Sequence, residues 1–235
     1  MSDFQLLLKN FNDFKNPQKA QILSRFFKTS PGQYGQGDLF LGIVVPLQRD
    51  LVKRFWDSLT LKETEKLLRS QYHEHRLTAL LILVKKYQKG DLILRQKIFD
   101  LYLKNTRFIN NWDLVDLSAP NIVGTHLLDK PRSLLKTLAR SDSLWERRIS
   151  LLACLPLIKN HDFVDLLTLS QILISDSHDL IHKALGWMLR EMGKVDQSIL
   201  INYLDQFATK LPRTALRYSL EKLPETKRQF YLKLK

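Results

Sequence analysis

The stretch EHRLTALL at residues 74–81 has two relatives further along the chain, WERRISLL at residues 145–152 and IHKALGW at residues 181–187. Each places a basic side chain just before a run of apolar residues. The basic residue of the second copy, Arg147, lies 71 positions after its counterpart in the first and 36 positions before Lys183 in the third. Such a period, with two helices per unit, predicts a right-handed superhelical solenoid of HEAT-like, armadillo-type helical hairpins.

The stacking of such hairpins determines where the repeated side chains lie. In a solenoid one helix of every pair lines a concave surface. The basic residue near the start of each repeated helix would therefore join a row on that surface. The sequence predicts an all-α fold in which residues 1–235 form a single HEAT-like repeat domain with a concave basic face.

Proline and glycine divide the chain into helices rather than strands. Prolines stand where a helix can begin, because a first-turn residue needs no backbone donor, and two glycines follow lysine-rich stretches as C-terminal caps do. These residues are Pro17, Pro46, Pro131, Pro212, Pro224, Gly90 and Gly193. The pattern predicts helices at residues 3–13, 17–28, 46–57, 61–71, 74–89, 91–105, 111–127, 131–141, 143–159, 162–174, 178–192, 196–208, 212–222 and 224–233. Only residues 40–45 are apolar and β-branched enough to form a short extended piece.

The charge of the chain is strongly positive. Its 235 residues include 37 Lys and Arg against 24 Asp and Glu, a formal net charge of +13. Basic residues recur along the whole chain rather than in a tail, which predicts an extended positive surface of the kind that follows nucleic-acid phosphates. The charge alone also fits a merely soluble basic protein or a partner for an acidic protein.

The sequence also indicates the cellular compartment of the protein and whether it binds a metal or a nucleotide. Neither a run of about 18 apolar residues nor a signal region is present, so we expect no membrane span, no secretion and a cytoplasmic protein. The single Cys154 lies in an apolar run and is expected to be a buried thiol in a reducing compartment. The glycine-rich segment at 31–38 lacks the ending of a phosphate loop. His178 and His182 have i,i+4 spacing without a third ligand, so no metal is expected.

An aromatic ring and a carboxylate stand four residues apart at the start of the helix predicted at 111–127. At about 100° per residue, Trp112 and Asp116 project from nearly the same side of that helix. Leu114 and Leu117 point away from them, so we expect the core to take the leucines. Trp112 and Asp116 are left to face something else.

The two ends of this short stretch carry further signals. Asn110 or Asn111 can cap the helix by accepting from first-turn backbone donors. Pro120 removes the hydrogen bond to the Asp116 carbonyl and crowds it, so the helix should bend where the carboxylate lies. The alternative interpretation is structural: a first-turn aspartate favoured by the helix dipole, beside a half-buried tryptophan.

The helix predicted at 178–192 separates an apolar stripe from a basic one. Lys183, Trp187 and Arg190 fall opposite the apolar residues, where the core does not claim them. An indole among cations and next to Gly186 suggests a surface that something approaches closely. Packing of Trp187 against the next repeat is the alternative that a solenoid also permits.

Arg148 lies on an otherwise apolar stripe, where an unpaired guanidinium would be costly. It therefore needs an anionic partner. That partner is either a carboxylate in an ion pair within the repeat or a DNA phosphate near the face that carries Trp112 and Asp116.

Four segments, taken together, resemble one known family. They are WDLVD at 112–116, WERR at 145–148, KALGWMLRE at 183–191 and PRTALRY at 212–218. They look like the DNA alkylation repair family, the HEAT-like-repeat DNA glycosylases of the AlkD type, and the resemblance covers nearly the whole chain.

The resemblance implies roles for particular residues. Asp116 would be the catalytic carboxylate, Trp112 and Trp187 would flank the deoxyribose of the lesion, and Arg148 would hold a nearby phosphate. Further DNA contacts would come from Arg147, Lys183, Arg190 and Arg213. Some relatives lack the aspartate and the tryptophan pair, so their presence here favours an active member. The chain departs from the family in its glycine-rich insertion at 31–38 and at Pro156.

The chemistry fits these residue types independently. Alkylation at N3 or N7 of a purine makes a cationic leaving base, and a carboxylate beneath the sugar stabilises the positive charge that forms as the base departs. Two indole faces attract a cationic nucleotide at about 0.5 to 2 kcal/mol each. With no evident lysine nucleophile, we expect a monofunctional, cofactor-free and monomeric glycosylase that acts on 3-methyladenine, 7-methylguanine and bulkier adducts in duplex DNA and leaves an abasic site. The resemblance implies that the base is not drawn into a deep pocket.

Two other classes of protein remain open at this stage. A non-catalytic helical-repeat module would recognise distorted DNA or RNA through phosphates, and would not need Asp116 for its function. An armadillo-like protein adaptor would bind DNA poorly and almost independently of salt.

Overall fold

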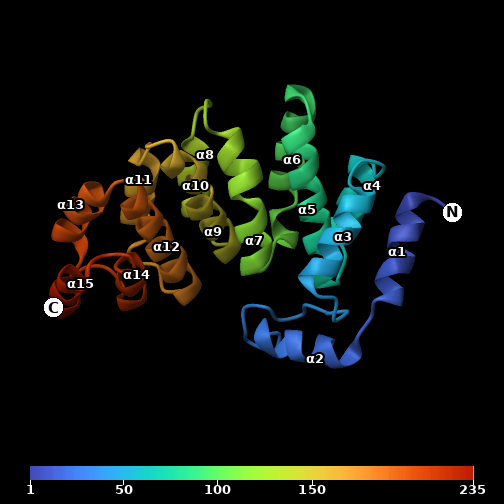
Figure 1. Ribbon diagram of the computed structural model, residues 1–235, viewed down its shortest axis with the longest axis horizontal. Helices are drawn as coiled ribbons and strands as arrows, with labels where there is room; N and C mark the ends of the chain where they lie inside the picture. The colour runs from blue at the N-terminus through green and yellow to red at the C-terminus, as the bar shows by residue number, and fades with distance from the viewer. Residues whose placement is uncertain (235) are drawn as a thin grey trace. The chain divides into compact units, whose positions relative to one another are not determined.

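The chain is helical throughout the residues that the computed structural model describes, 1–234, and no β-strand occurs among them. The predicted all-α, helical-repeat fold is confirmed, whereas the right-handed superhelix and the single-domain organisation stay predictions. Contacts between residues divide the chain into two compact units, Met1–Ser118 and a second unit that begins at Ala119. Figure 1 labels their helices.

The first unit is built around its longest helix, α5. Its elements are α1 (Asp3–Asp13), α2 (Pro17–Phe26), α3 (Val45–Phe55), α4 (Leu61–Leu68), α5 (His73–Lys89), α6 (Leu92–Lys104), a 3-10 turn η1 (Thr106–Phe108) and α7 (Trp112–Ser118). Helix α5 packs against α3, α4, α6 and α7, and its residues 79–84 are all buried. A helix that is apolar on every side in this way belongs at the centre of a fold.

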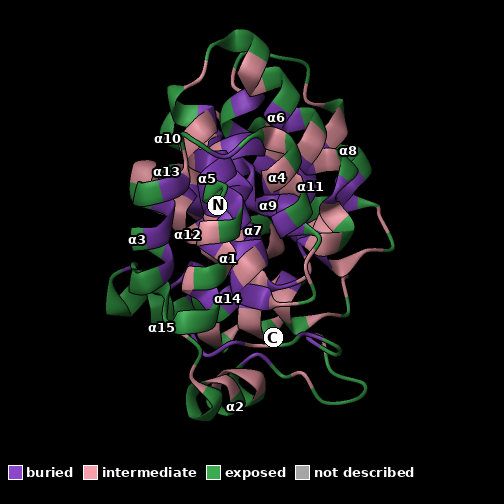
Figure 2. Ribbon diagram, turned by 90° about the vertical axis from the view of Figure 1, so that its right-hand side faces the viewer, coloured by how far each residue is buried: buried purple, intermediate pink, exposed green. Residues whose placement is uncertain are grey.

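Helix α2 differs from the others of this unit because none of its residues is buried. Figure 2 shows it only in the colours of exposed and intermediate positions. It begins as predicted at Pro17, with the Asn16 side chain accepting from the backbone of Lys19 at 2.9 Å. Large apolar side chains remain exposed on it, Ile22 and Phe26 among them.

The second unit is centred on α12. Its elements are a π-helical turn η2 (Pro120–Gly124), α8 (Ser133–Ala139), α9 (Leu144–Leu152), α10 (Cys154–Lys159), α11 (Val164–Leu173), α12 (Asp179–Val195), α13 (Gln197–Phe207), α14 (Arg213–Ser219) and α15 (Glu225–Lys233). Helix α12 packs against α9, α10, α11, α13 and α14. Its predicted apolar stripe, from Ile181 to Met192, is buried, and Cys154 is buried as expected.

Two helices predicted as continuous are broken at prolines. The segment predicted at 143–159 divides into α9 and α10 at Ala153, because Pro156 has no N–H for the Leu152 carbonyl and its ring crowds that carbonyl. The segment predicted at 111–127 leaves the α-helix at Ser118 and continues from Pro120 as the π-helical turn. Both predictions of a single helix were wrong for the same reason.

Two smaller predictions were also wrong. Gly193 does not cap a helix but lies inside α12; a Cβ there would come within 2.3 Å of the Leu200 side chain, so glycine allows α13 to pack closely. Residues 40–45 form no strand, and the nearest extended contact is a single bridge between Leu39 and Tyr72. Gly90 does end α5, as predicted.

Candidate functional site

Trp112 and Asp116 lie one turn apart on α7 in the first unit, and both are half-buried. The core of the unit takes Leu114 and Val115, which are fully buried. Leu117, expected in the core, is only half-buried, whereas Asp113 is buried. The helix thus presents the ring and the carboxylate outside its buried face.

The start of α7 is fixed by asparagines, as the sequence suggested. The Asn111 side chain accepts from the backbone N–H of Trp112 at 2.9 Å. The Asn110 amide donates to Asp38 at 3.0 Å. Its far end is fixed as well, since the buried Tyr102 hydroxyl contacts the Ser118 hydroxyl at 3.0 Å. Both ends of this short helix are therefore held by side chains from other segments.

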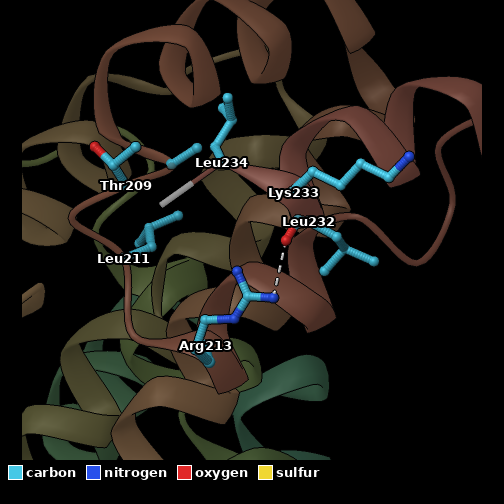
Figure 3. A pocket seen from close by; sticks show the side chains of 7 residues that line it. Thr209, Leu211, Arg213, Leu232, Lys233 and Leu234 are labelled. Atoms are coloured by element: carbon cyan, nitrogen blue, oxygen red, sulfur yellow. Dashed lines mark hydrogen bonds between the residues drawn. The ribbon is translucent and has the colours of Figure 1, made fainter.

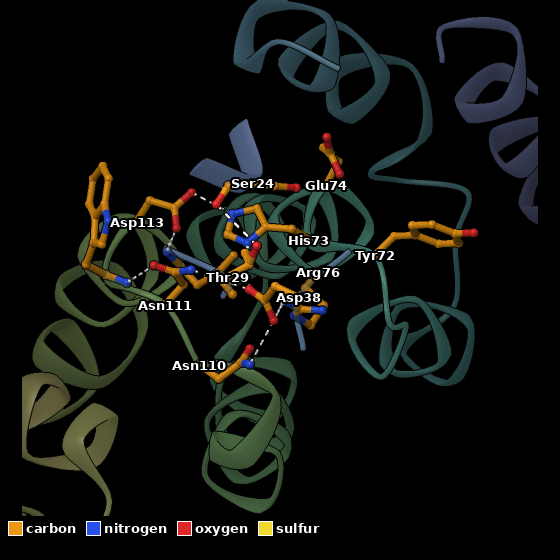
Figure 4. Close-up of polar contacts among 12 residues, drawn as sticks. Ser24, Thr29, Asp38, Tyr72, His73, Glu74, Arg76, Asn110, Asn111 and Asp113 are labelled. Atoms are coloured by element: carbon orange, nitrogen blue, oxygen red, sulfur yellow. Dashed lines mark hydrogen bonds and ion pairs between the residues drawn. The ribbon is translucent and has the colours of Figure 1, made fainter. Parts of the chain in front are cut away.

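A buried polar cluster lies beneath the first turn of α7 and was not predicted. Its centre is His73, whose ring nitrogens lie 3.2 Å from an Asp38 carboxylate oxygen and 2.9 Å from an Asp113 carboxylate oxygen. Arg76 pairs with Asp38 at 2.7 Å. Figure 4 shows the imidazole between the two carboxylates, with Asn110 on the far side of Asp38. We call Asp38, His73, Arg76 and Asp113 the His73 cluster.

In the His73 cluster each charged group stabilises the ionised form of its oppositely charged neighbour. Burial alone would disfavour a charged imidazole, but the Asp113 charge and the hydrogen bonds to Asp113 and Asp38 outweigh it and raise the pKa of His73 to about 9. Burial would likewise raise the pKa of Asp38, yet its hydrogen bond to His73 and the Arg76 charge keep that pKa below its usual value. At neutral pH the cluster therefore holds two cations and two anions.

Aromatic rings connect the cluster to Trp112. Phe27, just after α2, stacks on the Trp112 indole with centroids 5.3 Å apart and an interplanar angle of 25°. The same ring lies 4.7 Å from His73, and Phe40 stacks on His73 from another direction, also at 4.7 Å. Phe26 meets the indole edge-on at 6.0 Å. One face of Trp112 is thus supported by Phe27 while the residue stays half-buried.

In the second unit Trp187 lies on α12 and is half-buried. Its indole N–H donates to Glu191 at 3.1 Å. The same carboxylate pairs with Lys194 at 2.7 Å and with Arg190 at 3.4 Å. Arg190 also pairs with Glu221. The indole therefore has a fixed orientation along the helix, with cations beside it.

The space beside Gly186 is filled by another helix of the protein. A Cβ at this position would lie 2.4 Å from the Ala215 carbonyl oxygen and 2.5 Å from the Tyr218 Cβ. The close approach suggested by the glycine is real, but the approaching group is α14 and not a ligand. Trp187 follows directly and remains on the side of α12 that is not fully buried.

The basic residues near the starts of the repeated helices hydrogen-bond to the backbone of the protein. Arg76 and Arg147 each donate to two backbone carbonyls five and six residues earlier, at 3.0 to 3.1 Å. Arg147 also pairs with Asp176 at 2.7 Å. In the third copy His182 contacts the carbonyl six residues earlier. The true counterpart of Arg147 is therefore His182, and the alignment that placed Lys183 there was wrong by one residue.

A model of the DNA alkylation repair enzyme family matches residues 7–223, which is more than nine-tenths of the chain. The chain belongs to the DNA alkylation repair enzyme family.

One solved structure has a fold similar to that of the chain. A predicted DNA alkylation repair enzyme from Enterococcus faecalis superposes with a TM-score of 0.68 at 20% sequence identity, covering 90% of this chain and 97% of its own. At this identity the likeness concerns the fold. No curated protein sequence matches the chain closely.

The remaining basic residues of this DNA alkylation repair family member differ in their surroundings. Lys183 pairs with Asp179 at 2.8 Å, and its side chain is 41% exposed. Arg148 is buried and donates to the Leu180 carbonyl at the start of α12. Arg213 is exposed and donates to the Leu232 carbonyl at 3.1 Å, at the edge of a pocket near the end of the chain (Figure 3).

Other candidate groups have ordinary structural roles in this family member. His178 caps α12 by accepting from the Leu180 N–H at 3.1 Å. Within residues 1–234 no three His, Cys, Asp or Glu side chains gather as a metal site. No helix in that part of the chain has both the length and the apolar surface to cross a bilayer.

The His73 cluster is the part of the site that sequence reasoning missed. A signal was present, because His73, Glu74, His75 and Arg76 place four polar residues at the start of an otherwise apolar helix. Charged residues that enter a core need partners, and Asp38, at the end of the glycine-rich segment, is one of them. The sequence of that segment lacks phosphate-binding features, and no local pattern marks Asp38 as a residue of the core.

Proposed function

We propose that the protein is a monofunctional DNA glycosylase that hydrolyses the N-glycosidic bond of cationic alkylated purines in duplex DNA and leaves an abasic site. Membership of the DNA alkylation repair enzyme family indicates a role in alkylation repair. The reaction class is our inference from the residues of α7 and α12. In this proposal the enzyme acts as a monomer in the cytoplasm of a bacterial-type cell, where it associates with the nucleoid by binding DNA.

The arrangement of α7 is the observation that carries the proposal. A half-buried carboxylate, Asp116, lies one turn from a half-buried indole, Trp112. Phe27 stacks on the indole, and the contact between Tyr102 and Ser118 holds the far end of the helix. As the damaged base departs, the sugar becomes oxocarbenium-like. A carboxylate oxygen near the sugar stabilises that charge and orients the attacking water.

The lesion supplies the remaining driving force. An N3- or N7-alkylated purine is cationic and leaves without protonation by an acid, so the proposed reaction needs no general acid. The indoles of Trp112 and Trp187 would flank the sugar and attract the cation. In this proposal the base stays in the duplex rather than entering a deep pocket, so bulky adducts are tolerated.

We assign the binding of DNA phosphates to five basic residues. Lys183 and Arg213 have exposed side chains suited to phosphates. Arg147, Arg148 and Arg190 already donate to groups of the protein. A guanidinium has five N–H donors, so the half-buried Arg147 and Arg190 can still contact a phosphate. Arg148 is buried and would have to become exposed to do so.

The decisive experiment is mass spectrometry of bases released from methylated duplex DNA. The Asp116→Asn variant should release neither 3-methyladenine nor 7-methylguanine above the spontaneous rate while keeping its DNA affinity. Asp100→Asn, a matched change at an exposed residue of α6, should retain the wild-type rate. Release by Asp116→Asn at the wild-type rate would overturn the catalytic assignment.

The same assay separates the enzyme from a non-catalytic module that binds distorted DNA or RNA. Such a module would bind without any release by the wild type. Salt dependence separates both from a protein adaptor, because about 6 to 10 phosphate contacts would reduce DNA affinity by about 10³ to 10⁵ between about 50 and 200 mM salt. Weak, salt-independent binding would favour the adaptor.

A further inference from the structure

The His73 imidazole is clamped between carboxylates that come from two distant parts of the chain. Asp38 lies 35 positions before it and Asp113 lies 40 positions after it. Its side chain is 2% exposed, so these contacts lie in the protein interior. The clamp therefore joins the end of the glycine-rich segment, the first turn of α5 and the first turn of α7.

The geometry selects one protonation state of the ring. Each ring nitrogen lies within hydrogen-bond distance of a carboxylate oxygen, 3.2 Å on the Asp38 side and 2.9 Å on the Asp113 side. A neutral imidazole has one N–H and would turn its lone pair toward the other carboxylate. Only the imidazolium donates on both sides. The raised pKa of His73 agrees with this geometry.

The clamp acts on the part of α7 that matters for the proposed reaction. Asp113 stands directly after Trp112 and three residues before Asp116. Asp38 also accepts from the amides of Asn110 and Asn111, at 3.0 and 3.4 Å. The residues that lead into α7 and its first turn thus all depend on the two carboxylates that His73 joins. A rotation of this turn would change the direction of every side chain on the short helix.

We infer that His73, as a buried imidazolium between Asp38 and Asp113, is a positioning residue that sets the orientation of Trp112 and Asp116 toward the lesion. The inference rests on the proposed glycosylase function. His73 does not touch the substrate; it acts through Asp113.

The surroundings of the ring leave few other charges to consider. Arg76 faces the ring from α5 itself, Asp38 from the glycine-rich segment and Asp113 from α7. The rings of Phe27 and Phe40 cover the remaining sides at 4.7 Å each. Deprotonation of His73 therefore changes the cluster from balanced to net negative.

The test compares single-turnover rates of base release by the wild type and by His73→Gln between about pH 7 and pH 10. Glutamine can donate to one carboxylate but carries no charge. We expect the variant to be about 10- to 100-fold slower at pH 7, the range caused by small displacements of reacting groups. The ratio of the two rates at each pH cancels the ionisation of the lesion itself. It should approach one as pH rises through about 9, because the wild type then loses the same charge.

Three controls isolate the positioning role. DNA affinity of His73→Gln should stay near that of the wild type, and His75→Gln, the same change two residues away, should keep the wild-type rate. The double variant His73→Gln with Asp113→Asn restores the balance of charge, and it should recover much of the lost rate. A rate ratio that is constant with pH, or a double variant no faster than the single one, would overturn the inference.

A measurement on the wild type alone covers the case in which His73→Gln does not fold. The ¹⁵N resonances of the His73 ring should show both nitrogens protonated at pH 7, and the release rate should fall over the pH range in which that proton is lost. A neutral ring at pH 7, or deprotonation without a change in rate, refutes the inference. A wild type that releases no base refutes the proposed function instead.

Discussion

Glu74 offers the sharpest test of how the first unit holds the segment that leads to α3. The residue is 1% exposed, and its carboxylate accepts hydrogen bonds from three consecutive backbone N–H groups. The distances are 2.9 Å from Leu41, 2.8 Å from Gly42 and 3.2 Å from Ile43. We predict that Glu74→Gln destabilises the protein although glutamine has almost the same shape.

The magnitude follows from the three contacts. A hydrogen bond to a charged group contributes about 1.5 to 3 kcal/mol, and a neutral one about 0.5 to 1.5 kcal/mol. Replacing the carboxylate by an amide therefore removes about 1 kcal/mol at each of three donors, or about 3 kcal/mol in total. The amide nitrogen would also face the Leu41 N–H, which both carboxylate oxygens contact in the wild type.

The free energy of unfolding from urea denaturation measures the global effect, and hydrogen exchange measures the local one. If the segment detaches before the protein unfolds, the amides of Leu41, Gly42 and Ile43 should exchange about 100-fold faster, as about 3 kcal/mol implies. Glu63→Gln is the matched control, because Glu63 accepts from the Thr60 backbone at an exposed helix start, and it should lose about 1 kcal/mol at most. Equal losses in the two variants, with unchanged exchange at 41–43, would refute the reasoning.

Three further predictions concern packing, acid and the repeat. Gly186→Val should lower the melting temperature in a thermal scan, since its Cβ would lie 2.4 Å from the Ala215 carbonyl oxygen and overpacking typically destabilises by about 1 to 3 kcal/mol. Burial and nearby positive charges lower the pKa of His75 from 6.5 to about 4. Between these two pH values the native state binds fewer protons than the unfolded state, so the free energy of unfolding decreases as the pH drops through this range. Urea titrations at pH 7 and 4.5 should show that His75→Gln reduces this fall. Arg147→Met should cost about 2 kcal/mol through lost carbonyl contacts, whereas Arg217→Met, an exposed control on α14, should leave the urea midpoint unchanged.

The local features of the fold were accessible from the sequence because their causes are local. Caps and prolines act within a turn, so the start of α2 at Pro17 and the end of α5 at Gly90 followed from a few residues each. The apolar stripe of α12 followed from its period. The break at Pro156 was the exception, because an otherwise continuous apolar pattern outweighed the proline in the prediction. At Pro120 a bend within one helix was expected, whereas the α-helix ends at Ser118.

The His73 cluster was beyond reach for a different reason. Its members are separated by 35 and 40 positions, and no period or motif joins Asp38 to Asp113. A buried cation predicts that an anion lies nearby without saying which one. Arg148 shows the same difficulty, since one of its partners is a backbone carbonyl, which no pattern of side chains reveals.

The repeat itself indicates which residues belong to the fold and which to the site. Arg76, Arg147 and His182 all contact a carbonyl six residues earlier. The recurrence of an N–H donor at this position is therefore explained by the fold, because each side chain closes the start of its helix.

With this alignment Trp187 falls where the other two copies have Leu81 and Leu152. Both leucines are buried, whereas Trp187 is half-buried and donates its indole N–H to Glu191. Leucine satisfies the packing at the two other positions, so a tryptophan here agrees with the proposed contact between Trp187 and a lesion. The cation that a damaged base carries is a partner for which an indole face is suited and a leucine is not.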